Sequence, residues 1–422
     1  MSAPIQQLRG LEILDSRGRP TVMARCRLRS GAIGRAAVPS GASRGAAEAL
    51  ELRDGDQTRY RGLGCRQAVA HLDGLIADAV VGRSFTDQAA FDQLLDTLDG
   101  TPNKARLGAN ATLAASLAFA RASANDRDLP LYQYAAAMDT APGVLELPRP
   151  MINLFSGGKH AGGQVPIQDL LIIPQATTMA GLLEQAVAVF QSAAEIMQQR
   201  YGMRLLTADE GGLAPPFPTL DALFEDALEA IERAGLRPGS DVRLAVDVAA
   251  SHFYTGHAYQ LGGRTLDGTA MIDQLAHWAE AYALASIEDG LAEDDWTHWS
   301  QLCTRLAAQT LIVGDDLLCT NPARIERAVR TAAANTLLLK VNQIGTLSEA
   351  LAARRIARAA GWQVIVSARS GETEDSWLAD LAVGWGGDQI KIGSVTQSER
   401  LAKYNRLLEL ERFDGIPLRK PT

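Results

Sequence analysis

Carboxylates and lysines follow a series of short apolar runs in the second half of this 422-residue chain. Asp247 ends the run RLAV, Glu288 ends LASI and Asp315 follows TLIVG, while Lys340 follows TLLL and Lys391 lies within QIKIG. A lysine at the end of a buried strand is costly to desolvate, and a single one would more often extend to solvent or pair with a nearby carboxylate. Because the pattern recurs from run to run, we interpret these side chains as one shared site.

These residue types suit a particular chemistry. Three carboxylates without a cysteine pair or clustered histidines are typical ligands of a hard cation, Mg²⁺ rather than Zn²⁺. Near such a cation and near each other, Lys340 and Lys391 are expected to have lowered pKa values, so that one could act as a neutral base. Glu210 and Asp169 could supply the acid. A metal, a lysine base and a carboxylic acid suit removal of a proton beside a carboxylate, followed by loss of a leaving group.

The spacing of the runs predicts the elements that carry them. They recur about every 25 residues, with helix-like segments such as 321–334 and 347–360 between them. Repeated strand–helix units of this kind indicate a parallel sheet covered by helices, and roughly 280 residues are enough to close it into a (β/α)₈ barrel. In such a barrel the carboxyl ends of the strands meet at one mouth.

The first third of the chain has a different pattern. Residues 8–30 alternate like paired strands around a tight turn at 16–20, and residues 45–138 are mostly helix-like. This order predicts an α+β domain. We therefore expect an N-terminal α+β capping domain over 1–138 and a barrel domain over 139–422, with the boundary in the segment 139–150.

Composition excludes several classes of protein. The net charge is −8 and no basic run is present, which argues against nucleic acid and anionic membranes as partners. No uninterrupted apolar stretch is long enough to span a bilayer. The four cysteines form no CxxC pair and are typical of reduced, mostly buried thiols. A cytoplasmic location is therefore expected.

Two loops leave alternatives open. AAVPSGASRG at 36–45 is either a plain connector or a lid whose Ser43 reaches the site. The glycine-rich loop after MINLF holds Lys159 and His160, but glycines without a following helix are a weak phosphate-binding signal. His160 taken alone would more often be structural.

Long motifs occur in an order that resembles the enolase family over nearly the whole chain. They include LDSRGRPT at 14–21, VPSGAS at 38–43, DEGGLAP at 209–215, SIEDGLAEDDW at 286–296, LLLKVNQIGTLSE at 337–349 and ERLAKYN at 399–405. The resemblance implies an N-terminal α+β cap on an enolase-type (β/α)₈ barrel, with an irregular ββαα start before the regular βα units. It also implies a small anionic substrate and a homodimer, with a higher oligomer as an alternative.

The resemblance implies a role for each matching residue. Asp247, Glu288 and Asp315 would bind a first Mg²⁺, and Ser43 would help to hold a second that bridges to the substrate. Lys340 would remove the C2 proton of a 2-phosphoglycerate-like substrate. The remaining catalytic and substrate contacts would come from Glu210 at the departing C3 hydroxyl, Asp169, His160 on the leaving-group side, Gln168, Lys391 at the carboxylate, and Arg369 and Ser370 at the phosphate.

Several positions depart from the family's pattern. The family's Ser-His-Arg-Ser near the phosphate is SARS at 367–370, so Ala368 removes an imidazole from the substrate pocket. Lys159 adds a cation where the family usually has a small or acidic residue. Asp169 is one methylene shorter than the family's glutamate. Ala208 replaces a glycine, and Gln397 replaces an arginine that is common in the family.

Three functions compete. A wider pocket with an added cation favours a modified substrate that bears a carboxyphosphono group, as in enolase relatives that make carboxyphosphonoenolpyruvate for phosphinate antibiotic biosynthesis. Lys159, or the space at Ala368, would accommodate the extra carboxylate. The alternatives are an ordinary glycolytic enolase that tolerates these substitutions and a non-catalytic relative with a structural or binding role. The clustered charges argue against the last, because such clusters are costly without chemistry.

Overall fold

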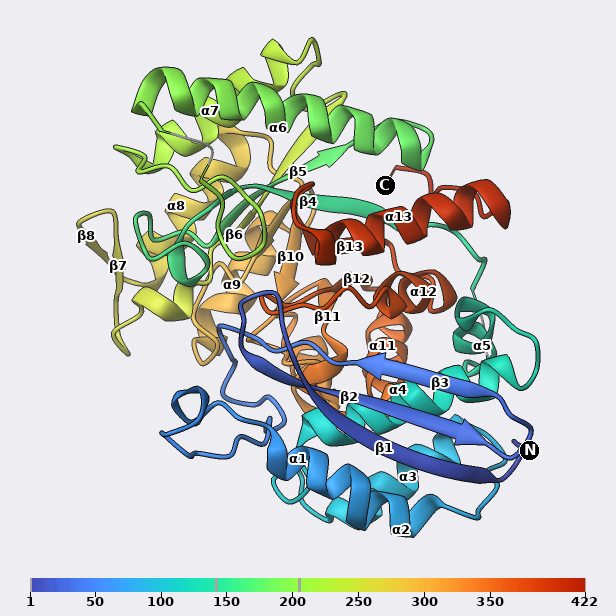
Figure 1. The fold of residues 1–422 in the computed structure, drawn as a ribbon. Coiled ribbons are helices and arrows are strands. Elements are labelled where there is room, and N and C mark those ends of the chain that lie inside the picture. The colour runs from blue at the N-terminus through green and yellow to red at the C-terminus, as the bar shows by residue number, and fades with distance from the viewer. Residues whose placement is uncertain (1, 141–142, 204–205, 422) are drawn as a thin grey trace.

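Alternating residues at the start of the chain form a three-stranded antiparallel sheet (Figure 1). Its strands are β1 (Ile5–Leu14), β2 (Pro20–Leu28) and β3 (Ile33–Ala37). Gly18 has a φ of 68° in the turn between β1 and β2, a conformation that glycine adopts without a steric cost. The structure is a computed structural model, and it describes residues 2–140, 143–203 and 206–421.

Helices complete the N-terminal part. They are α1 (Arg66–His71), α2 (Ala77–Val80), α3 (Gln88–Asp99), α4 (Ala109–Asn125) and α5 (Leu131–Ala137), and a π-helical turn at Leu72–Ile76 joins the first two. The alanine-rich α4 is almost wholly buried against the sheet. A Cβ on Gly34 of β3 would lie 2.1 Å from the carbonyl oxygen of Ala118, so this close approach requires glycine. The part is therefore α+β, as the sequence predicts.

Eight strands close into the predicted barrel. They are β4 (Arg149–Ser156), β5 (Asp169–Pro174), β6 (Val242–Asp247), β9 (Ser286–Glu288), β10 (Leu311–Gly314), β11 (Thr336–Leu339), β12 (Gln363–Ser367) and β13 (Gln389–Gly393). β13 pairs with β4 to complete the ring. β5 runs antiparallel to both neighbours, and α6 (Met179–Tyr201) and α7 (Leu220–Arg233) follow it. The irregular ββαα start is thus confirmed, while the exact division at residue 138 stays a prediction.

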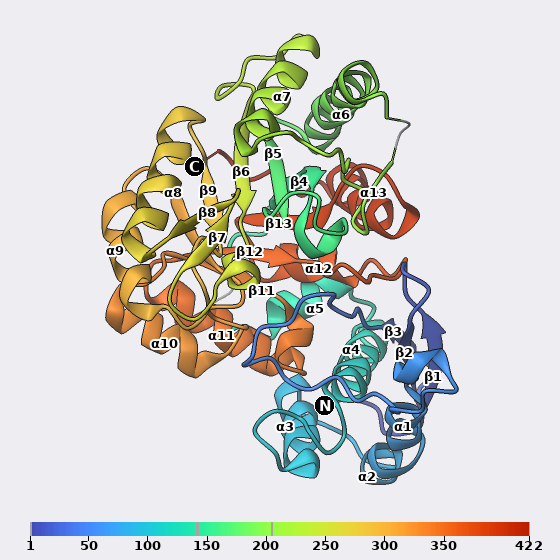
Figure 2. The same ribbon diagram turned by 90° about the vertical axis from the view of Figure 1, so that its left-hand side faces the viewer.

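The later helices cover the outside of the barrel (Figure 2). They are α8 (Gly268–Ala281), α9 (Trp296–Leu306), α10 (Pro322–Thr331), α11 (Leu347–Ala359), α12 (Trp377–Gly384) and α13 (Ser398–Phe413). A small hairpin of β7 (Tyr259–Leu261) and β8 (Arg264–Leu266) precedes α8. Among the described residues, no helix is both long enough and apolar enough to cross a membrane.

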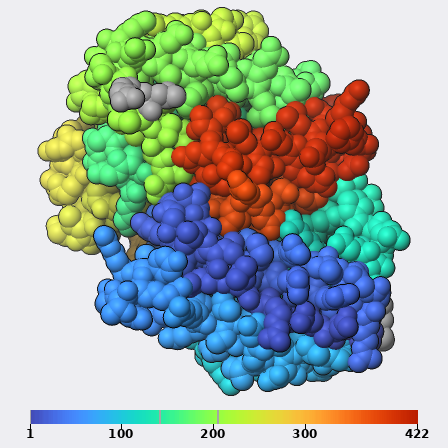
Figure 3. All heavy atoms as spheres, in the orientation of Figure 1, coloured from blue at the N-terminus to red at the C-terminus, as the bar shows by residue number. Residues whose placement is uncertain are grey.

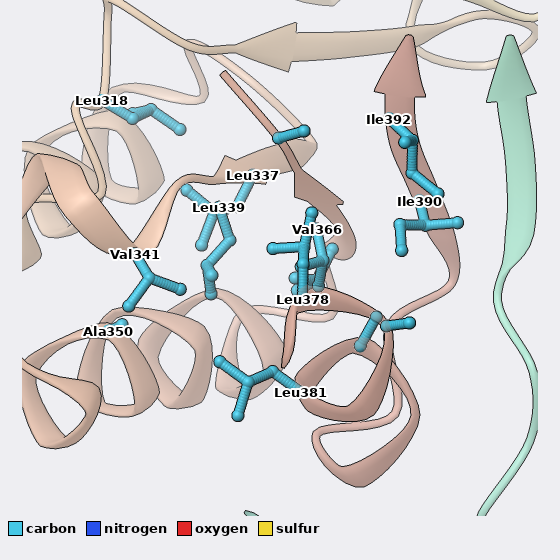
Figure 4. Packing of buried hydrophobic residues seen from close by; sticks show 14 of the residues in the cluster. Leu318, Leu337, Leu339, Val341, Ala350, Val366, Leu378, Leu381, Ile390 and Ile392 are labelled. Carbon is cyan, nitrogen blue, oxygen red and sulfur yellow. The ribbon is translucent and has the colours of Figure 1, made fainter. Parts of the chain in front are cut away.

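Strand alternation turns the charged residues into the barrel. Leu337 and Leu339 pack outward toward α11 and α12 (Figure 4), whereas Leu338 belongs to a separate cluster inside the ring. Side chains two residues apart on a strand share a face, so Lys340 follows Leu338 inward. Lys391 likewise lies between two outward-facing isoleucines of β13. Three acids also face inward, because each lies two residues from an apolar residue of the inner cluster. The pairs are Asp169 with Leu171, Asp247 with Ala245, and Asp315 with Val313.

The N-terminal part lies against the mouth of the barrel. Ser40 forms an antiparallel bridge with Gly371, and the amide of Ala49 donates to the carbonyl oxygen of Gln343 at 2.8 Å. The space-filling view shows the N-terminal segment in direct contact with the C-terminal one (Figure 3). The cap therefore packs beside the strand ends that carry the charged residues.

Candidate active site

Two carboxylates of the predicted metal site share one ammonium group. Lys391 Nζ lies 2.8 Å from Asp247 Oδ2 and 2.8 Å from Glu288 Oε2, and all three side chains are buried. Burial disfavours the charged amine, but these two carboxylates outweigh it and raise the pKa of Lys391 well above its usual value. The strand ends of β6, β9 and β13 thus meet at one point.

The second lysine pairs with the third acid. Lys340 Nζ contacts Asp315 Oδ2, and Asp315 Oδ1 accepts a hydrogen bond from Gln343 Nε2 at 2.9 Å. Burial lowers the pKa of Lys340, but the negative charges of Asp315 and Glu288 together outweigh it, and the net shift is upward. In this structure the surrounding acids together outweigh both burial and the repulsion between the two amines, so the pKa values of both lysines are raised. The expectation of lowered pKa values concerned lysines beside a bound cation, and it stays a prediction.

A histidine links two buried acids on the opposite side of the mouth. His160 Nδ1 lies 2.9 Å from Asp169 Oδ2, and its Nε2 lies 3.7 Å from Glu210 Oε1. Burial disfavours the imidazolium, yet Asp169 and Glu210 raise the pKa of His160 to about 9. Burial raises the pKa of Asp169. Burial also raises the pKa of Glu210, but the combined positive charges of His160, Arg400 and the two lysines outweigh it and lower that pKa. At neutral pH the imidazole of His160 is therefore protonated and lies between the two carboxylates.

The predicted phosphate ligands lie under the loop at 36–45. The buried guanidinium of Arg369 makes two 3.1 Å contacts with the carboxylate of Glu48, one from each Nη atom. It also donates to Asn342 Oδ1 and to the carbonyl oxygen of Ser43, both at 2.9 Å. Ser370 Oγ accepts from the amide of Ala42 at 2.7 Å. The loop therefore reaches the site, as the lid interpretation requires.

The remaining predicted residues surround this centre. Gln168 Nε2 donates to Asp247 Oδ2 at 3.1 Å. Ala368 is buried at the end of β12 next to Arg369. Lys159 is exposed and makes no hydrogen bond or ion pair with any residue that the structure describes. It is the predicted residue that the structure does not join to the others by a direct contact.

Two departures from the family's pattern contact each other. Gln397, which has a φ of 69°, donates through Nε2 to the carbonyl oxygen of Ala208 at 3.2 Å. Ala208 immediately precedes the turn that carries Glu210. These substitutions therefore lie behind the acid side of the site and do not face its centre.

The oxygen donors fit a hard divalent cation. Glu288 Oε1 is buried and has no hydrogen-bond partner within the described part of the chain. Together with Asp247 and Asp315 it offers an all-oxygen donor set of the kind that Mg²⁺ prefers. Among the described residues, two groups bring possible ligand atoms within 4.8 Å of one another, namely His160 with Asp169 and Glu210, and Asp289 with Asp315 and Asp316; Asp247, Glu288 and Asp315 do not form such a group. Asp289 accepts hydrogen bonds from the amides of Asp315 and Asp316 at 2.9 and 2.8 Å and so fixes the loop after β10.

Two protein-family models match this chain, and together they cover most of its length. The model described as enolase, C-terminal TIM barrel domain, matches residues 144–415, and the model described as enolase, N-terminal domain, matches residues 5–135. The chain belongs to the enolase family. An enolase-family chain of this architecture is a hydro-lyase, and the family binds Mg²⁺ and small anionic substrates.

Sequence reasoning did not single out two residues of this enolase site. Glu48 forms an ion pair with the guanidinium of Arg369, and it lies just beyond the lid, immediately before the sequence ALELRDG at 49–55. Arg400 is fully buried, and its guanidinium donates to the carbonyl oxygens of Arg369 and Ser370 at 2.7 and 2.6 Å. The closing helix also holds Arg406 and Arg412, so the sequence did not distinguish Arg400; only its burial, which requires acceptors for the guanidinium, shows its role.

Proposed function

We propose that this enolase-family protein dehydrates a 2-phosphoglycerate-like substrate that bears a carboxyphosphono group, giving carboxyphosphonoenolpyruvate in phosphinate antibiotic biosynthesis. One observation carries the choice of substrate. Lys340, Lys391, His160 and Arg369 each contact a carboxylate of the protein, whereas Lys159 has no anionic partner among the described residues. An unpaired cation beside the site suits an additional anionic group on the substrate.

The reaction would begin at Lys340. Mg²⁺ held by Asp247, Glu288 and Asp315, with a second ion near Ser43, would supply positive charge opposite the charge that develops on the substrate carboxylate. Lys340 would have to lose the proton that Asp315 now stabilises before it accepts the C2 proton. Its position at the end of β11, inside the ring, supports this role.

Departure of the C3 hydroxyl would depend on the residues across the barrel mouth from Lys340. Glu210, His160 and Asp169 together hold the proton that the leaving hydroxyl needs, and Glu210 would assist its departure. The hydrogen bond from Asn153 Nδ2 to Glu210 Oε2, at 3.0 Å, would keep that carboxylate aimed into the barrel.

The substrate's anionic groups would be divided among the remaining residues. Lys391 would meet the C1 carboxylate, while Gln168 orients Asp247 beside it. Arg369 and Ser370 would bind the oxygens on phosphorus. The methyl side chain of Ala368 would leave room for the larger phosphorus substituent, and Lys159 would neutralise its carboxylate.

The Lys159→Ala variant tests the choice of substrate. The kcat/KM ratio of the carboxyphosphono substrate to 2-phosphoglycerate should fall about tenfold, because one opposite charge near a bound anion is lost. Lys420→Ala removes another exposed lysine and is the matched control. An unchanged ratio in Lys159→Ala would remove the support that this residue gives to the proposal.

Ordinary glycolytic enolase is the second candidate. The same metal-site acids and the Lys340 base support it, since conversion of 2-phosphoglycerate to phosphoenolpyruvate would need the same chemistry. A non-catalytic structural or binding role remains a third hypothesis, and calorimetry that detected no Mg²⁺ binding would favour it.

We also propose that the protein is a cytoplasmic homodimer. Leu11 and Leu14 of β1 are 56% and 54% exposed, which is unusual for leucines on a strand. Leu14 borders a surface hollow that Met23 and Glu372 also line. Light scattering of the purified protein tests the dimer, and a monomer mass at micromolar concentration would contradict it.

A further inference from the structure

A histidine near the mouth of the barrel has a ring nitrogen that no described residue contacts by a hydrogen bond. His252 lies in the 3₁₀ turn η4 (Ala250–Phe253), five residues after the end of β6 at Asp247. Its Nδ1 atom is buried and has no hydrogen-bond partner among the described residues, although the ring as a whole is half-buried. A buried ring nitrogen without a partner is costly unless something else binds it.

Lys159 lies on a neighbouring loop. It belongs to the 3₁₀ turn η3 (Gly158–His160), which follows β4. β4 and β6 flank β5, and the register places Ser156 opposite Asp169 and Asp169 opposite Asp247. The two turns thus leave the same end of three adjacent strands.

The electrostatics of His252 agree with this placement. Burial, and then the positive charge of Lys159, lower the pKa of His252 to about 4. The imidazole is therefore neutral at physiological pH and offers one N–H donor beside the unpaired ammonium of Lys159.

Hydrogen bonds connect the turn that carries His252 to the segment that holds the predicted phosphate ligand Arg369. Ser251 Oγ, next to His252, accepts from the amide of Glu293 at 3.0 Å. Glu293 Oε2 accepts in turn from the amide of Ala46 at 2.9 Å. Three residues earlier, the carbonyl oxygen of Ser43 holds Arg369. These contacts join the turn that carries His252 and the guanidinium of Arg369 to the same segment of the chain, residues 43–46.

We propose that Lys159 and His252 together form a subsite for a carboxylate bonded directly to the phosphorus atom whose oxygens bind at Arg369. Lys159 supplies the charge and the N–H of His252 supplies a directed hydrogen bond. This inference rests on the proposed function, because only a carboxyphosphono substrate carries such a group. It adds His252 as a residue that determines specificity.

Two small ligands isolate the subsite from the reaction. Phosphonoformate carries a carboxylate on phosphorus, and inorganic phosphate does not. Calorimetric titration of each into the protein with Mg²⁺ gives an affinity ratio that is independent of turnover. We expect the wild-type protein to bind phosphonoformate about tenfold more tightly than phosphate, the gain of one charge-assisted contact.

Substitutions then test which residues produce the preference for phosphonoformate over phosphate. His252→Leu and Lys159→Met should each remove most of it, whereas His252→Asn, which keeps an N–H near the position of Nδ1, should retain part. His257→Ala removes an exposed histidine from the following turn and should have no effect on the ratio. Thermal unfolding confirms that each variant is folded. An unchanged ratio in His252→Leu, or an equal loss of both affinities, would overturn the assignment.

The outcomes for the subsite and for the proposed function can be told apart. A wild-type protein with no preference for phosphonoformate overturns the subsite, whatever the turnover assays give. A clear preference that depends on His252, without turnover of the carboxyphosphono substrate, supports the subsite and contradicts the proposed reaction.

Discussion

Glu48 holds Arg369 in a two-armed ion pair, with 3.1 Å between nitrogen and oxygen on each arm. The pair joins the segment after the lid to the residue expected to bind the substrate's phosphorus oxygens, and both side chains have low exposure. A bound phosphoryl group would need the same guanidinium face. Substrate binding and release of Glu48 are therefore expected to be coupled.

Glu48→Gln tests this coupling. The substitution removes the competing charge but keeps the shape, so inorganic phosphate should bind about three- to tenfold more tightly with Mg²⁺ present. Calorimetry measures the affinity, and Glu326→Gln is the control because Glu326 is exposed on α10. Weaker phosphate binding by Glu48→Gln would mean that the carboxylate orders Arg369 for the ligand and does not compete with it.

Lys340 and Glu210 should affect different steps. Lys340→Ala should lower exchange of the C2 proton in deuterated water by about 10²- to 10⁴-fold, the usual contribution of a catalytic base. Glu210→Gln should retain that exchange and lose elimination, because it perturbs the acid side. NMR of the substrate follows exchange and product formation in the same tube. Persistent exchange in Lys340→Ala would assign the base to another residue.

Asp92 predicts a pH-dependent contribution to stability. Its buried carboxylate accepts hydrogen bonds from Gln88 Nε2, Ser116 Oγ and Ser348, which lies at the start of α11, so it joins the cap to the barrel. Burial raises the pKa of Asp92 to about 6. The folded state therefore binds this proton more tightly than the unfolded state, and the stabilisation is complete below about pH 4 and lost as the pH rises through 6.

The measurement compares wild type with Asp92→Asn. The free energy of unfolding from urea titrations should fall in the wild type, relative to the variant, by up to about 3 kcal/mol between pH 4 and pH 7. The asparagine cannot titrate, so the difference isolates one group. Parallel pH profiles would show that Asp92 stays ionised throughout this range.

The local sequence was sufficient to predict those strands and helices that depend on neighbouring residues alone. The apolar run at 336–339 predicts a buried strand that ends at Lys340, and the structure has this strand. The bounds of α6, Met179–Tyr201, also follow local signals: Thr178 accepts from the amide of Gly181 at its start and Gly202 is left-handed at its end.

Local sequence was insufficient where distant segments meet. Glu48 and Arg369 are 321 residues apart in the chain, and neither position alone indicates the other. The lysine pKa values depend on distances between charges from separate strands, and the acids outnumber the amines near Lys391. Within the described part of the chain, Nδ1 of His252 has no hydrogen-bond partner, and only the folded structure shows that this atom is buried.

The most direct measurement is the relative kcat/KM of the wild-type protein for the two substrates. Purified protein with Mg²⁺ is mixed with 2-phosphoglycerate or with its carboxyphosphono counterpart, and enol product is followed beside a glycolytic enolase. We predict at least about 10²-fold preference for the carboxyphosphono substrate, since small changes in positioning have effects of that size. Turnover of 2-phosphoglycerate at a rate near that of the glycolytic control would contradict the account and identify an ordinary enolase.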